Sequence, residues 1–172
     1  MKRIAVYCGA SKGNKSLHTD ATVQLGTYLA EHNLELVYGG GKVHGVMPQE
    51  LVDRGASLDR LTDLKVVDNM STRKKTMLND SDGCIALPGG PGTLEEIIEA
   101  FSWARLGDND NPCVFYNVAG YYDSLRDMFD NMVQNGYLTQ SDRSKLLFSD
   151  SLTEIFEFME NYIPPRIRQY SK

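Results

Sequence analysis

The chain contains few residues that could bind a metal or form disulfides. Its three cysteines, Cys8, Cys84 and Cys113, show no Cys-x-x-Cys spacing, and its three histidines show no spacing typical of zinc ligands. Each cysteine lies in or beside an apolar run, which indicates buried thiols in a reducing compartment. We therefore expect free thiols, no metal site and no bound cofactor.

Signals for secretion, membrane insertion and nucleic-acid binding are also absent. The first three residues precede only a short apolar stretch, so we expect no signal peptide. No apolar segment approaches the roughly 20 residues needed to span a bilayer. The net charge of -5 argues against a general nucleic-acid-binding protein, which usually presents a basic face. These absences predict a cytoplasmic protein that binds neither membranes nor nucleic acid.

Two common nucleotide-binding motifs are missing as well. No Gly-x-Gly-x-x-Gly follows the first apolar run, which argues against a dinucleotide site of the usual type, and no Walker A pattern occurs. Internal repeats, linkers and low-complexity tracts are likewise absent. A length of 172 residues fits one domain, which we place at residues 1–163, with residues 164–172 as a frayed tail.

Short apolar runs alternate with stretches of helical periodicity along the chain. The predicted strands are 4–8, 34–38, 64–67, 84–87 and 113–116, and the predicted helices are 16–32, 71–79, 93–106, 121–134 and 152–162. Alternation of this kind gives a parallel sheet that helices cover on both faces. The sequence therefore predicts an α/β fold with a doubly wound, Rossmann-like sheet in a single domain.

Three of the predicted strands end in loops of glycine or small residues. These loops are Gly9-Ala10-Ser11, Gly39-Gly40-Gly41 and Gly89-Gly90. A single loop of this kind often reflects turn geometry alone. In a parallel sheet, however, all three lie at the carboxyl edge, where ligands of open α/β folds bind. Their convergence indicates a binding site at that edge.

The segment from Pro88 to Glu96, PGGPGTLEE, joins a buried strand to a helix. A glycine-rich turn at a helix start leaves backbone N–H groups free, and together with the helix dipole they form an anion site. We expect the same turn to place Glu95 and Glu96 in the first helical turn. Thr93 and Glu96 also fit a capping box, a structural explanation for Glu96 that is compatible with a chemical role. A phosphate site beside a carboxylate predicts an enzyme acting on a phosphorylated small molecule.

Basic residues open an earlier predicted helix, at Arg73, Lys74 and Lys75. A solvated basic face would explain them, but the helix dipole disfavours cations at this end, which hints at an anionic partner. Arginine suits such a partner because its planar fork holds a phosphate or carboxylate through two hydrogen bonds. Glu95 and Glu99 repel each other one helical turn apart, so near a pocket they would need a cation.

These segments resemble the LOG ("lonely guy") family, cytokinin riboside 5′-monophosphate phosphoribohydrolases long mislabelled as lysine decarboxylases. PGGPGTLEE matches the family motif PGGxGTxxE, and Arg73-Lys74 with the downstream Met77 matches its upstream Arg-Lys element. The segments VYGGGKV at 37–43, YCGAS at 7–11 and NVAGYYD at 117–123 also look like family segments. The resemblance extends over nearly the whole chain.

The resemblance implies hydrolysis of the N-glycosidic bond of a purine nucleoside 5′-monophosphate, without a cofactor, by a homodimer. Arg73 and Glu96 would be the catalytic pair, although the pattern leaves open whether Glu95 or Glu96 performs the chemistry. Adenine and prenylated adenine both remain open as the base. The implied substrate- and phosphate-binding residues are Lys74, Gly89, Gly90, Gly92, Thr93, Glu95, Ser102, Ser11, Gly40 and Gly41.

Two departures from the family pattern bear on activity. Between Val43 and His44 the chain lacks roughly twenty residues, about one helix and one strand by usual element lengths. We hypothesise that a mobile segment is missing from the printed sequence there, because a genuine deletion would remove a central strand and with it the fold. In addition, Gly55 follows Arg54 where the family usually has a glutamate that contacts substrate.

Two other functions are compatible with some of these features. A nucleotide-binding protein with impaired catalysis would fit the loss of the glutamate at Gly55. Lysine decarboxylation normally needs a pyridoxal phosphate lysine and a partner for the ring nitrogen. None of Lys42, Lys74 and Lys75 has that context in the sequence.

Overall fold

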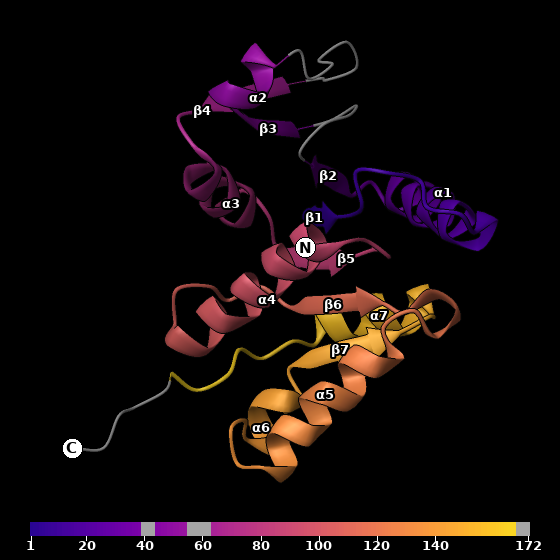
Figure 1. Ribbon diagram of the computed structural model, residues 1–172, viewed down its shortest axis with the longest axis vertical. Coiled ribbons are helices and arrows are strands. Elements are labelled where there is room, and N and C mark those ends of the chain that lie inside the picture. The colour runs from indigo at the N-terminus through magenta and orange to yellow at the C-terminus, as the bar shows by residue number, and fades with distance from the viewer. Residues whose placement is uncertain (39–43, 55–62, 168–172) are drawn as a thin grey trace.

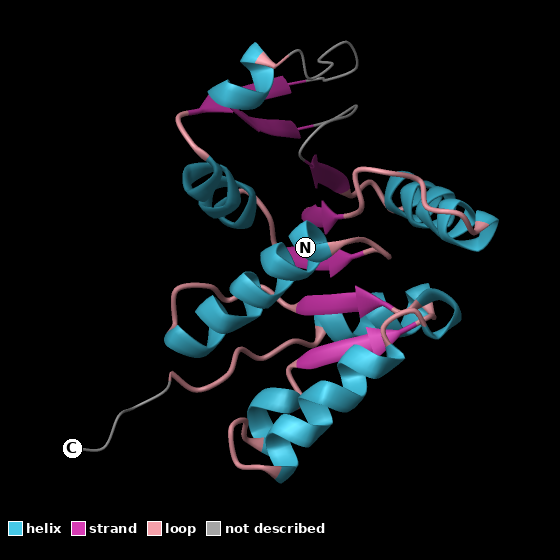
Figure 2. Cartoon of the chain, viewed as in Figure 1, coloured by secondary structure: helices cyan, strands magenta, loops and turns pink. Residues whose placement is uncertain are grey.

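The computed structural model describes residues 1–38, 44–54 and 63–167. Within these ranges seven strands form a single, entirely parallel sheet flanked by helices (Figure 1, Figure 2). The strands are β1 (Arg3–Tyr7), β2 (Glu35–Tyr38), β3 (His44–Pro48), β4 (Asp63–Val67), β5 (Gly83–Ala86), β6 (Cys113–Tyr116) and β7 (Leu146–Ser149). The helices are α1 (Ser16–Glu31), α2 (Gln49–Asp53), α3 (Met70–Asn79), α4 (Pro91–Leu106), the short 3-10 turn η1 (Val118–Gly120), α5 (Asp123–Gln134), α6 (Gln140–Arg143) and α7 (Leu152–Glu160).

Alternation along the central strands gives the sheet two buried faces. In β1, Ala5 and Tyr7 point into one hydrophobic cluster, and Ile4 and Val6 point into the other, as the two-residue period of a strand requires. Helices α3, α4 and α5 contribute to the first cluster, and helices α1 and α7 contribute to the second. The sheet is therefore the middle of three layers, and the predicted α/β fold class is confirmed.

The strand order β4-β3-β2-β1-β5-β6-β7 places β1 and β5 at the centre of the sheet. From β1 the chain first builds one wing, β2 to β4, and then crosses to the other side of β1 to build β5 to β7. Such a reversal opens a crevice beyond the carboxyl ends of the two central strands. The loops that begin at Cys8 and Leu87 flank this crevice.

The structure adds strands β3 and β7, helices α2 and α6 and the short turn η1 to the predicted elements. Strand β3 was not predicted because Gly45 and Pro48 make 44–48 a poor strand by composition. Helix α2, which follows it directly, was not predicted either. Burial nevertheless holds β3 in the sheet, since Val46 and Met47 are only 2% and 4% exposed. The prediction that 113–116 is the last strand is wrong, because β7 pairs with β6 beyond it.

Within the described residues, strands β2 and β3 are joined by the pairs Val37 with His44 and Tyr38 with Gly45. Five residues, 39–43, separate these strands in the sequence, fewer than the dozen or more that parallel neighbours usually require. Strand β3 is accordingly displaced toward the carboxyl ends of the sheet and pairs with β4 along its full length. A deletion between Val43 and His44 was expected to remove a central strand and with it the fold. The sheet of the 172-residue chain is nevertheless continuous from β4 to β7.

The ends of the predicted domain are described as far as Ile167. Within the predicted tail Pro165 is buried and Ile167 is exposed, and Ile163, the last residue of the predicted domain, is exposed as well. Among the helices of the described ranges, none combines the length and apolar composition needed to cross a bilayer.

Replacing Gly89 with alanine is expected to destabilise the fold by about 1–3 kcal/mol, because the packed site leaves no room for a methyl group. A Cβ at Gly89 would lie 2.8 Å from the Cβ of buried Thr93 and 2.9 Å from the backbone nitrogen of Gly9. Urea denaturation would measure the change in the free energy of unfolding.

Gly90→Ala is the matched control. A Cβ at Gly90 would meet nothing within 4 Å, and its φ of -92° suits alanine. Equal stability losses in the two variants would contradict the packing argument.

Candidate active site

A cavity of about 510 Å³ lies at the crevice between the two wings of the sheet. Its walls come from the ends of the two central strands and their neighbours, from the first turn of helix α3 and from the first two turns of helix α4. The lining residues are Val6, Tyr7, Cys8, Gly9, Ala10, Tyr38, Met70, Arg73, Gly90, Pro91, Gly92, Thr93, Glu95 and Glu96. This size suits a mononucleotide-sized ligand.

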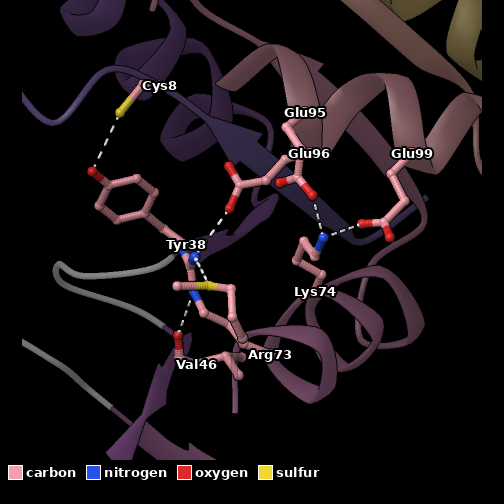
Figure 3. A network of polar contacts seen from close by, with 9 residues as sticks. Cys8, Tyr38, Val46, Arg73, Lys74, Glu95, Glu96 and Glu99 are labelled. Atoms are coloured by element: carbon pink, nitrogen blue, oxygen red, sulfur yellow. Dashed lines mark hydrogen bonds and ion pairs between the residues drawn. The ribbon is translucent and has the colours of Figure 1, made fainter. Parts of the chain in front are cut away.

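An ion pair between Arg73 and Glu96 spans the cavity wall (Figure 3). The Arg73 Nη1 atom donates to Glu96 Oε1 at 3.0 Å, and the two side chains are only 14% and 13% exposed. The Nε of Arg73 also donates to the carbonyl oxygen of Val46 in β3, at 3.2 Å. The guanidinium is thus fixed from two sides and oriented toward the carboxylate.

Local structure explains the position of this arginine. The Asn69 side chain caps helix α3 by accepting a hydrogen bond from the backbone N–H of Thr72, so Arg73 falls in the first turn. The helix dipole disfavours a cation there, and the nearby Glu96 carboxylate compensates for it. The predicted anionic partner of Arg73 is therefore a carboxylate of the protein itself.

Burial raises the pKa of the Glu96 carboxyl above its ordinary value. The charge of Arg73 acts in the opposite direction, while the neighbouring Glu95 carboxylate adds to the increase. A carboxylate held beside a cation in a poorly hydrated wall can accept a proton or stabilise a positive charge close to it.

Free backbone donors face the same cavity. Helix α4 begins at Pro91, its N-cap is Gly90, and no side chain caps it. The first-turn N–H groups of Gly92 and Thr93 have no carbonyl one turn earlier in the helix. The Gly90 N–H donates to no acceptor within the described residues. These amides lie where the sequence predicts an anion site, and the dipole of helix α4 favours negative charge there.

The start of helix α4 corrects the predicted capping box. Thr93 was expected at the N-cap and Glu96 three residues later, but the N-cap is Gly90, three residues earlier, because Pro91 suits the first helical position. Thr93 is buried inside the first turn, and Glu95 and Glu96 lie in the second. Glu96 is therefore not a capping residue.

Lys74 occupies a different environment from its neighbour Arg73. Its ammonium group contacts the carboxylates of Glu95 and, at 2.6 Å, Glu99, and its side chain is 14% exposed (Figure 3). The predicted cationic partner of the two glutamates is thus confirmed. Lys74 does not line the cavity, so the structure does not bring it together with the amides that would hold a phosphate.

The remaining predicted residues are spread over several positions. Ser11 is exposed and lines a smaller hollow beside the cavity, and Ser102 is exposed on helix α4, away from the cavity lining. Gly40, Gly41 and Gly55 lie outside the described residues. Of the two candidate glutamates, Glu96 faces Arg73, while Glu95 is more exposed and pairs with Lys74.

Tyr38 was not predicted as a site residue. It ends strand β2 at the carboxyl edge, and its hydroxyl accepts a hydrogen bond from the Cys8 thiol at 3.2 Å (Figure 3). Desolvation raises the pKa of the Tyr38 phenol, so it stays neutral beside the ion pair. The signal that could have identified it was its place just before the glycine-rich loop.

Metal-ligating side chains do not gather in this part of the molecule. Within the residues that the structure covers, no group of three or more His, Cys, Asp and Glu side chains could hold a metal ion. The cavity offers instead one ion pair, the tyrosines Tyr7 and Tyr38, and a row of backbone amides. This arrangement can bind an anion and stabilise a positive charge next to it.

Comparison with known proteins identifies related chains. A family model described as "Possible lysine decarboxylase" matches residues 31–159. Cytokinin riboside 5′-monophosphate phosphoribohydrolase LOG1 from Arabidopsis thaliana is 38% identical, covering 99% of this chain and 88% of that protein. A second relative, named probable cytokinin riboside 5′-monophosphate phosphoribohydrolase LOGL2 and from Oryza sativa subsp. japonica, is 37% identical, covering 99% of this chain and 77% of that protein.

The alignment with the Arabidopsis protein extends over 188 positions, so at least 16 of them have no residue in this 172-residue chain. Among solved structures, the molybdenum cofactor binding protein from the phototrophic bacterium Rippkaea orientalis is similar, with a TM-score of 0.63 at 18% identity. That match covers 93% of this chain and 96% of the other, and it shows the fold alone. The family-model match and the curated relatives together show that the chain belongs to the LOG family, whose curated members are named cytokinin riboside 5′-monophosphate phosphoribohydrolases.

Proposed function

We propose that this protein hydrolyses the N-glycosidic bond of purine nucleoside 5′-monophosphates, releasing the free base and ribose 5-phosphate. The observation that carries the proposal is the Arg73–Glu96 pair facing a row of free amides across one cavity. The names of the curated relatives support the same reaction.

The backbone amides at Gly90, Gly92 and Thr93 would hold the 5′-phosphate. Anions bind at helix N-termini because unpaired N–H groups and the dipole both favour negative charge. Binding energy from the phosphate, remote from the reacting bond, would position the ribose against the carboxylate wall. The open space beside Gly90 leaves room for the phosphate oxygens.

Glu96 would act at the anomeric carbon. As the bond from C1′ to the base nitrogen breaks, positive charge develops on the ribose, and a nearby carboxylate stabilises it. Water supplies the hydroxyl that adds to C1′, and the proton that water loses ends on the departing base. Glu96 can orient that water or accept its proton.

Arg73 would hold the Glu96 carboxylate in place and contact the nucleotide. Its guanidinium is fixed by Val46 and Glu96, so it presents its remaining donors at a defined position. Tyr38 forms the facing wall of the cavity.

A nucleotide-binding protein with impaired catalysis is the second candidate, motivated by Gly55 in place of the family's glutamate. It predicts tight AMP binding without base release. Lysine decarboxylation is less favoured, because none of the described lysines lines the cavity and Lys74 is engaged by two carboxylates. A panel of substrates would decide whether the base is adenine or a prenylated adenine.

We further propose that the protein is a cytoplasmic homodimer. The three free thiols at Cys8, Cys84 and Cys113 suit a reducing compartment. A partner subunit would give the exposed Ser102 a place at the site of the other chain. Light scattering coupled to gel filtration should give about 39 kDa, twice the chain mass of 19.3 kDa; a single species at the chain mass would contradict the dimer.

Glu96→Gln is expected to lower base release from AMP or N6-isopentenyl-AMP by at least about 100-fold, because the neutral amide neither stabilises the cation nor accepts a proton. Chromatographic measurement of free base would follow the reaction. Glu95→Gln, the same change on the adjacent residue, should stay within about threefold of wild type, since Glu95 pairs with Lys74 instead.

The reverse order of activities would assign the chemistry to Glu95. Binding of AMP by the wild-type protein with no base release under any condition would favour the second candidate over the hydrolase.

The rate should fall as the pH is lowered through the pKa of Glu96, because the protonated acid carries no charge. Burial raises this pKa, so the fall is expected above the ordinary glutamate value of about 4.3. Charged and titratable groups that act on Glu96 come from four elements: Tyr7 in β1, Tyr38 in β2, Arg73 and Lys74 in α3, and Glu95 in α4.

Lys74→Met should move this acid limb to higher pH. The Lys74 charge lowers the pKa of Glu96, and its loss also leaves the Glu95 carboxylate uncompensated. Lys75→Met removes the same charge from an exposed neighbouring position and serves as the control. Equal pH–rate profiles for the two variants would show that the ion pairs of Lys74 do not act on the catalytic carboxylate.

A further inference from the structure

The hydroxyl of Tyr121 reaches from the loop after β6 to the glycine-rich loop after β5. It donates a hydrogen bond of 2.7 Å to the carbonyl oxygen of Gly89. The ring is 47% exposed and packs edge-on against His18 and Tyr122. Tyr121 does not line the cavity that holds Arg73 and Glu96, so the reaction described above does not involve it directly.

This hydrogen bond fixes the direction of one peptide unit. The Gly89 carbonyl and the Gly90 N–H belong to the same trans peptide and therefore point in opposite directions. With the carbonyl held toward Tyr121, the N–H points away from Tyr121. Tyr121 lines a separate hollow on its own side of the loop, and Gly90 lines both that hollow and the catalytic cavity. The unpaired N–H is thereby directed to the catalytic side.

The peptide between Gly89 and Gly90 needs this hydrogen bond to fix its orientation, because it joins two consecutive glycines. Gly89 and Gly90 both lack a Cβ, so rotation of the peptide between them meets little steric resistance. A rotated peptide would place the Gly89 carbonyl oxygen where the Gly90 N–H now lies, and an oxygen there would repel an anion. The Tyr121 hydroxyl opposes that rotation by holding the oxygen on the far side.

The loop that carries Tyr121 is itself held in an unusual conformation. Ala119 and Gly120 both have positive φ, 51° and 71°, and a non-glycine residue adopts such a φ only when its surroundings enforce it. Buried Asn117 supplies that support, because its Oδ1 accepts a hydrogen bond of 2.6 Å from the Tyr122 N–H. This backbone conformation fixes the directions in which the side chains of Tyr121 and Tyr122 leave the loop.

We propose that Tyr121 is a positioning residue of the anion site, which directs the Gly90 N–H at the phosphate by holding the Gly89 carbonyl. The proposal rests on the proposed function, in which this site takes the 5′-phosphate. Tyr121 is exposed and does not line the cavity, but it would contribute to the affinity of the site for the phosphate.

Tyr122 provides a matched control on the neighbouring peptide units. Its hydroxyl donates to the Leu87 carbonyl oxygen at 2.6 Å and also faces the N–H of Gly89. The Leu87 carbonyl shares its peptide with Pro88, which has no N–H. Tyr122 therefore acts on the two peptides before the one that Tyr121 holds, and neither of them carries the Gly90 N–H.

The test compares Tyr121→Phe with Tyr122→Phe, each of which loses one hydroxyl and keeps its ring. Calorimetry would measure affinity for ribose 5-phosphate, with adenosine as the ligand that lacks a phosphate, and steady-state kinetics on AMP would separate KM from kcat. For Tyr121→Phe we expect ribose 5-phosphate affinity to fall about 3- to 10-fold, with KM rising in parallel and kcat changing less than about twofold. For Tyr122→Phe we expect unchanged affinity, even if its melting temperature falls.

Unchanged ribose 5-phosphate affinity in Tyr121→Phe, or an equal loss in both variants or for adenosine, would overturn the inference. Those results would leave the proposed function intact if wild-type protein still releases base. Wild-type protein that binds ribose 5-phosphate without releasing base would instead sink the proposed hydrolase, while the Tyr121 comparison still decides the inference. Failure of the wild-type protein both to bind ribose 5-phosphate and to release base would overturn both.

Discussion

The contact between Arg73 and Glu96 joins helices that follow different parts of the sheet, so it depends on how both parts are placed. Arg73 belongs to helix α3, which follows the β2–β4 wing, and Glu96 belongs to helix α4, which follows the central strand β5. Two charges that are so little exposed must remain together, because leaving either one unpaired costs several kcal/mol. The pair therefore requires both wings to hold their positions on either side of β1.

Close backbone approach at the centre of the sheet makes this geometry possible. The loops after β1 and β5 touch through Gly9 and Gly89, and any side chain at Gly89 would collide with Thr93. That packing brings the start of helix α4 down onto the carboxyl end of the sheet. Free amides and a buried carboxylate, separated by only one helical turn, then face the same cavity. An anion site and a charge-stabilising group thus share one rigid element.

The sequence predicted the central strands and helices well because their apolar residues are periodic and their caps are ordinary. It missed β3, whose Gly45 and Pro48 disguise a strand that is held by burial, and it misplaced the start of α4 because Pro91 outweighs Thr93 as a start signal. Arg73 was predicted as a catalytic residue and Lys74 as a substrate-binding residue, both at the site. Successive helical residues differ by about 100° in direction, so only the folded helix shows that one faces Glu96 and the other faces Glu95 and Glu99.

The junction between β2 and β3 has a consequence for the energetics of the whole molecule. Within the described residues two pairs join these strands, Val37 with His44 and Tyr38 with Gly45, and the Arg73 guanidinium is tied to Val46 on the far side of that seam. Partial opening of the sheet along this seam would carry the guanidinium away from its carboxylate. A nucleotide touching both sides would oppose the separation, so occupancy of the cavity and cohesion of the β3–β4 edge would be thermodynamically linked.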